Sequence, residues 1–92
     1  MEQPLTYNAI AMFLEIVTPD KQVYSGDVQA VRVPGSEGAF EMLDRHASII
    51  SPLINGEIRI TTKDGEETFQ VQGGVVESLN NKTVILAEAI VE

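Results

Sequence analysis

The chain has 92 residues, 43% of them hydrophobic, and its fourteen acidic and six basic residues give a net charge of −8. This length allows one small domain, and the scattered basic residues exclude the basic stripe by which proteins bind nucleic acid. With no cysteine and a single histidine, the chain offers no disulfide and too few soft ligands for a zinc site.

Residues 1–11 contain a proline, mixed polarity and no periodicity. We expect them to be a flexible extension, followed by a single domain over residues 12–92. The N-terminus lacks the regions of a signal peptide, and no apolar run reaches the roughly 20 residues of a membrane span. The sequence therefore predicts a domain in a cytoplasmic compartment, with no insertion into lipid.

The first part of the domain shows the alternation of half-buried strands. A strand at 13–17 precedes a turn at 18–21 with proline in its second position. A short strand at 22–24 lies before Ser25-Gly26, and a longer strand at 27–33 lies after it. Within the longer one the apolar residues move from even to odd positions, which predicts a bulge or a strand that passes between two sheets.

The middle of the chain predicts a strand at 39–42, whereas the state of 43–53 stays open. Asn55-Gly56 indicates a turn, because both residues tolerate positive φ. A strand should follow at 58–62, because its apolar residues share one face.

Two further turn signals, Asp64-Gly65 and Asn80-Asn81, predict hairpins in the last third of the chain. The strands expected around them lie at 69–71, 75–79 and 83–87. Gly73-Gly74 marks a close approach of backbone, for which a neighbouring strand is the favoured explanation. The only helical indication is at 84–91, and it opens with a β-branched run. The pattern predicts an all-β fold, an antiparallel β-sandwich or flattened barrel.

The single histidine, His46, is the first catalytic candidate, and Asp44 could orient it as a general base. No nucleophile elbow or comparable signature accompanies it, so we expect no catalytic residue. A hydrogen-bonded histidine in a loop, or one that faces a partner, is the favoured interpretation.

Three acidic residues, Glu37, Glu41 and Asp44, lie close together in the sequence. Their spacing does not fit a calcium loop, which leaves solvated charge or contact with a basic partner and predicts no metal. Gly35 and Gly38 fit neither a P-loop nor a dinucleotide motif, so no cofactor or nucleotide is expected.

Taken in order, several motifs resemble the N-terminal β-sandwich domain of the epsilon subunit of the F-type ATP synthase, from about Met12 to Ala89. They are Leu14-Glu-Ile-Val-Thr-Pro, Tyr24-Ser-Gly-Asp-Val, Val33-Pro-Gly-Ser-Glu-Gly with Phe40 and His46-Ala, Leu53-Ile-Asn-Gly-Glu-Ile-Arg-Ile, Val71-Gln-Gly-Gly-Val-Val-Glu77 and Val84-Ile-Leu-Ala.

The resemblance implies a sandwich of about ten strands and a non-catalytic rotor subunit at the foot of the central stalk. The implied partners are the gamma subunit along one side and the polar loops of the c-ring at one end. Such a subunit couples ring rotation, driven by proton translocation, to gamma and thus to ATP synthesis. Its implied location is peripheral, on the cytoplasmic side of the bacterial plasma membrane.

Carried onto this chain, the c-ring contact falls on Glu37, Gly38, Ala39, Phe40, Glu41, Asp44, Arg45 and His46. The chain departs from the family pattern at several of these positions. Glu41 stands where glycine is common, Ala39 where an acid is common, and Asp44 where proline is common.

Most members of this family continue into two C-terminal helices that inhibit hydrolysis. If the sequence ends at Glu92, we expect that helical latch to be absent. Two alternatives to the rotor function remain at this point. One is a general acidic interaction module on a similar sandwich, and the other is an enzyme with His46 as its base.

Overall fold

The computed structural model describes residues 12–91, and every regular element in that range is a β-strand. The strands are β1 (Met12–Val17), β2 (Gln22–Val28), β3 (Ala30–Gly35), β4 (Gly38–Leu43), β5 (Ile49–Leu53), β6 (Gly56–Thr62), β7 (Gly65–Leu79) and β8 (Lys82–Val91). The all-β prediction is confirmed, whereas the described residues form eight strands rather than ten. They contain no helix that could cross a membrane. The extension expected at 1–11 lies outside the described residues.

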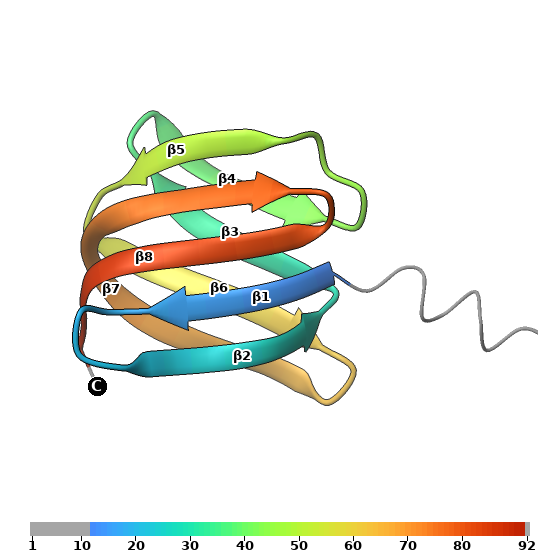
Figure 1. Cartoon of the computed structure of the whole chain (residues 1–92), viewed down its shortest axis with the longest axis horizontal. Coiled ribbons are helices and arrows are strands. Elements are labelled where there is room, and N and C mark those ends of the chain that lie inside the picture. The colour runs from blue at the N-terminus through green and yellow to red at the C-terminus, as the bar shows by residue number, and fades with distance from the viewer. Residues whose placement is uncertain (1–11, 92) are drawn as a thin grey trace, which may run out of the picture.

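The strands form two layers that share β7 (Figure 1). One layer contains β2, β1, β8, the C-terminal half of β7 and β5, and the other contains the N-terminal half of β7, β6, β3 and β4. The β-sandwich prediction is therefore confirmed. The antiparallel arrangement has one exception, because β1 and β8 pair in parallel. The Phe13 amide donates to the carbonyl oxygen of Asn81 at 3.0 Å, so β1 begins beside the turn from which β8 runs in the same direction.

The glycine pair Gly73-Gly74 lies inside β7, a single strand of 15 residues. The first half of β7 pairs with β6 and the second half with β5. Both glycines have positive φ, which lets the strand bend from one layer into the other without ending. A Cβ at Gly74 would collide with the carbonyl oxygen of Leu86 on β8, so the predicted close approach comes from a neighbouring strand. The bend explains one of the strands missing from the expected count.

The predicted passage of the chain between sheets occurs within 27–33, the segment in which it was expected. β2 runs through Ser25-Gly26 without a break, so the expected division there is wrong. The break falls at Gln29, whose amide donates to the carbonyl oxygen of Thr61 at 2.7 Å. Before Gln29 the chain pairs with β1, and after it the chain pairs with β4 and β6. This change of partner accounts for the shift between even and odd apolar positions.

The Asn80-Asn81 turn has positive φ at both residues, 52° and 61°, as predicted from its sequence. The strand expected after Asn55-Gly56 follows as β6, and neither of these two residues adopts a positive φ. Gly56 is needed for space instead, since a Cβ there would lie 2.9 Å from the Cβ of Pro34. The Ile54 amide donates to the carbonyl oxygen of Pro34 at 2.9 Å, which holds this corner against β3.

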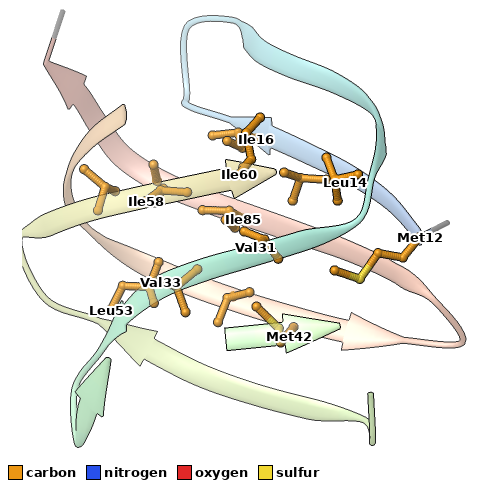
Figure 2. Close-up of a cluster of buried hydrophobic side chains, with 14 residues drawn as sticks. Met12, Leu14, Ile16, Val31, Val33, Met42, Leu53, Ile58, Ile60 and Ile85 are labelled. Atoms are coloured by element: carbon orange, nitrogen blue, oxygen red, sulfur yellow. The ribbon is translucent and has the colours of Figure 1, made fainter. Parts of the chain in front are cut away.

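The core lies between the layers and consists of aliphatic side chains and methionines (Figure 2). Its fully buried members include Leu14, Ile16, Met42, Ile58 and Ile85. Burial of each such side chain contributes roughly 1.5 to 3 kcal/mol. The strand alternation read from the sequence thus points its apolar residues inward, and Met42 on β4 is one of the core residues.

Candidate functional site

The expected contact residues form an elongated edge of the molecule, which we call the β4 edge and define as residues 37–46. It consists of the turn before β4, the strand itself and the turn after it. β4 ends the hydrogen-bonded order of the described strands, with β3 on its inner side. Six residues at about 3.3 Å per residue separate the two turns by about 20 Å.

The first turn of the β4 edge carries Glu37 at an exposed position. Gly35 and Gly38 pair across this turn, and Gly38 has a φ of 126°, which few residues other than glycine adopt. The Ser36 amide donates to the carbonyl oxygen of Pro52 at 3.0 Å and ties the turn to β5. Both glycines therefore shape a hairpin turn that presents a carboxylate.

The three acidic residues do not form a cluster. Glu37 lies in the first turn, and Glu41 lies on β4 as the cross-strand neighbour of Arg32. Asp44 lies in the second turn, where its carboxylate is 3.6 Å from Nε of Arg45. Among residues 12–91 no group of histidine and acidic side chains could hold a metal ion.

The second turn places His46 in solvent at the end of the β4 edge. Its amide donates to the carbonyl oxygen of Leu43 at 3.0 Å, and its Nδ1 lies 2.8 Å from the carbonyl oxygen of Ala47. The histidine is thus a hydrogen-bonded loop residue, held by backbone groups.

An open cleft of about 540 Å³ lies between the first turn and β5. Residues 36–40 form one wall and residues 49–52 form the other. Phe40, which packs partly against the core, and Ile50 supply apolar surface, and Glu37 stands at the same cleft. A partner segment that enters here would meet apolar walls and one carboxylate.

Beyond the cleft, the outer face of β5, β7, β8 and β1 exposes many apolar side chains, and we call it the apolar face. Two carboxylates, Glu77 and Glu15, also lie on it, in the row of Ile50 and Val84. Strand register places its side chains in rows. One row runs from Pro52 through Val75 and Leu86 to Val17. Ile50, Leu79 and Leu86 are 68%, 52% and 51% exposed, although large aliphatic side chains usually lie inside. The face is therefore suited to burial against a partner.

The outer face of the other layer is polar. Its central row runs from Glu41 through Arg32 and Arg59 to Thr68, all of them exposed. Arg59 donates to the Glu57 carboxylate at 3.2 Å on the same face. The sandwich thus has one outer face that is mostly polar and one that exposes many apolar side chains.

Sequence reasoning did not assign the residues of the apolar face to the site. The sequence did contain an indication of this face at 83–87. Odd-numbered and even-numbered residues there are all apolar or β-branched, which is the pattern of a strand covered on both sides. Whether the odd-numbered or the even-numbered side chains of β8 face outward depends on the layer that β8 joins. That layer is known only from the pairing of β8 with β1 and β7.

Known proteins resemble this chain over most of its length. The domain described as "ATP synthase, Delta/Epsilon chain, beta-sandwich domain" matches residues 11–92. The ATP synthase epsilon chain of Chlorobaculum tepidum is 40% identical over 81 residues, which cover 87% of this chain and 92% of that protein. The epsilon chain of Campylobacter hominis is 40% identical over 82 residues and is matched over 63% of its length.

Solved structures share the fold at low sequence identity. A chain of the mitochondrial ATP synthase of Euglena gracilis superposes with a TM-score of 0.84 at 18% identity, over 89% of this chain and 53% of that chain. A chain of the central stalk and c-ring structure from Tetrahymena thermophila superposes with a TM-score of 0.76 at 18% identity, over 88% of this chain and 66% of that chain.

Proposed function

The chain belongs to the epsilon-chain family of the ATP synthase, whose β-sandwich domain is non-catalytic, and we propose that it is a rotor component of the central stalk. In this proposal the gamma subunit covers the apolar face and the c-ring loops meet the β4 edge. The domain transmits ring rotation, driven by proton translocation, to gamma and thus to ATP synthesis elsewhere in the complex.

The observation that carries the proposal is the difference between the two outer faces. Ile50 and Leu86 are more than half exposed on one face, whereas Arg32 and Arg59 occupy the other. Burying apolar area at about 25 cal/mol per Å² favours association through the first face. A long-lived complex with a rotor shaft needs such an apolar contact, because surface ion pairs alone contribute little.

The β4 edge supports a second contact of different character. Glu37 and Glu41 are exposed on it, and the chain as a whole carries a charge of −8. Basic residues on a ring loop would meet complementary charge there. Such complementarity fixes the orientation of the two partners and speeds their association more than it raises their affinity. With both contacts, the domain would be peripheral, on the cytoplasmic side of a bacterial plasma membrane.

The substitution Leu86→Lys tests the gamma contact. It places a charge within the apolar face, so we expect the dissociation constant for the gamma subunit to rise about tenfold or more, the equivalent of about 1.4 kcal/mol. Titration calorimetry with purified gamma provides the measurement.

Thr68→Lys is the matched control, because it adds the same charge at an exposed position on the polar face. We expect it to leave the affinity for gamma unchanged. Equal effects of the two substitutions would exclude the apolar face as the gamma contact and would favour a general acidic interaction module.

A further inference from the structure

We propose that Asn81 is a positioning residue that fixes the second turn of the β4 edge in the shape that docks on the rotor. This inference rests on the proposed function. Its basis is a set of contacts between segments distant in sequence, the turn that joins β7 to β8 and the turn that follows β4.

The side chain of Asn81 uses both ends of its amide on the second turn. Its Oδ1 accepts the backbone N–H of Arg45 at 2.7 Å, and its Nδ2 donates to the Asp44 carboxylate at 2.6 Å. The backbone carbonyl of Asn81 also accepts the Phe13 amide at 3.0 Å. One residue thus joins the β4 edge, the β7–β8 turn and the start of β1, and we call its two side-chain bonds the Asn81 clamp.

The turn held by the clamp has a backbone conformation that is energetically unfavourable for the residues that form it. Arg45 has a φ of 63°, a left-handed conformation that costs a residue with a side chain roughly 1 to 2 kcal/mol. The neighbouring His46 amide closes the turn on Leu43, with Arg45 at its third position, where a positive φ usually calls for glycine or asparagine. The clamp bonds directly to the amide of the strained residue, so it offsets this cost.

The clamp therefore decides where Arg45 and His46 lie. Both side chains are exposed, and without the clamp the turn would gain conformations in which Arg45 returns to negative φ. A docking surface that must order itself on binding loses affinity through that ordering. Asn81 would thus strengthen docking without touching the partner.

Asn81→Gly removes the clamp while keeping a residue that tolerates the turn's φ of 61°. Asn80→Gly is the matched control, since Asn80 has a φ of 52° in the same turn and takes no part in the clamp. In the isolated chain we expect Asn81→Gly to speed hydrogen exchange of the Arg45 amide at least tenfold relative to Asn80→Gly. In the reconstituted holoenzyme we expect its association with the rotor to weaken severalfold.

A rescue separates the clamp from a general loss of stability. Asn81→Asp alone keeps the acceptor for Arg45 but places two carboxylates together, and should disrupt the turn. The double variant Asn81→Asp/Asp44→Asn exchanges donor and acceptor, and should restore both slow exchange and association.

Exchange as slow in Asn81→Gly as in Asn80→Gly would overturn the inference. Fast exchange of the Arg45 amide in Asn81→Gly with unchanged association with the rotor would overturn the inference as well. In that case a weakening of gamma binding by Leu86→Lys would still support the proposed function. If the unaltered chain failed to associate with the rotor, the proposed function and this inference would fall together.

Discussion

Tyr24 on β2 packs edge to face against Phe69 on β7, with 6.2 Å between the ring centroids. Its partial burial, together with the carboxylates of Glu67 and Asp27, raises the pKa of its phenol above the ordinary value of 10.0. Because the folded state favours the protonated phenol, Tyr24 contributes stability that is fully present below the unfolded pKa. This contribution is lost as pH rises through the higher folded pKa.

We therefore expect Tyr24→Phe to reduce the alkaline sensitivity of the fold. Below pH 9 the difference in unfolding free energy between the two proteins should be constant, and above pH 10 the unaltered protein should lose stability faster. Urea unfolding between pH 8 and 11.5 measures both curves, and lysine titration cancels in their difference. Parallel curves over the whole range would contradict this assignment.

Single residues also show how far sequence could predict local structure. The φ values of Asn80 and Asn81 followed from their identity, because asparagine tolerates the left-handed region that tight hairpins require. At Gly56 the tolerance of positive φ is not used, and the constraint is the nearness of Pro34 on another strand. A local pattern can predict a dihedral angle, but it cannot predict which backbone passes nearby.

Among the elements, β7 depends most on a bend at a defined point. Gly74 and Gly38 offer a matched comparison, since their φ values are 124° and 126°. A Cβ at Gly38 would meet nothing within 4 Å, whereas a Cβ at Gly74 would collide with the backbone of β8.

We expect Gly38→Ala to cost about 1 to 3 kcal/mol from backbone strain alone. Gly74→Ala should cost at least 2 kcal/mol more than Gly38→Ala, because overpacking against backbone adds to the same strain. Denaturant unfolding of the two variants gives the difference directly. Equal losses of stability would mean that the close approach of β7 and β8 does not constrain position 74.

The long β7 also shows why strand number was harder to predict than fold class. Alternation and turn residues indicate that a segment is extended, which was enough for an all-β sandwich. Whether Gly73-Gly74 ends a strand or bends it depends on its partners, β5 and β6, and on their positions in the two layers. The parallel pairing of β1 with β8 likewise left no local signal.

At the scale of the whole molecule, the sandwich presents two unlike outer faces and a charged edge. The β4 edge was predicted residue by residue from motif resemblance, and its role as the ring contact stays a proposal. The apolar face was not predicted, because Val84 and Leu86 alternate with buried Ile85 in a run that is apolar throughout. Nor could the sequence join Asn81 to Asp44, which lie 37 positions apart.

In the function proposed for it, this small domain is a rotor component that binds the gamma subunit. Coexpression of the full chain with gamma, followed by affinity purification and size-exclusion chromatography with light scattering, tests it most directly. We expect a stable one-to-one complex that persists in salt high enough to screen surface ion pairs. Failure of the two chains to copurify, with each folded and soluble by itself, would contradict the claim.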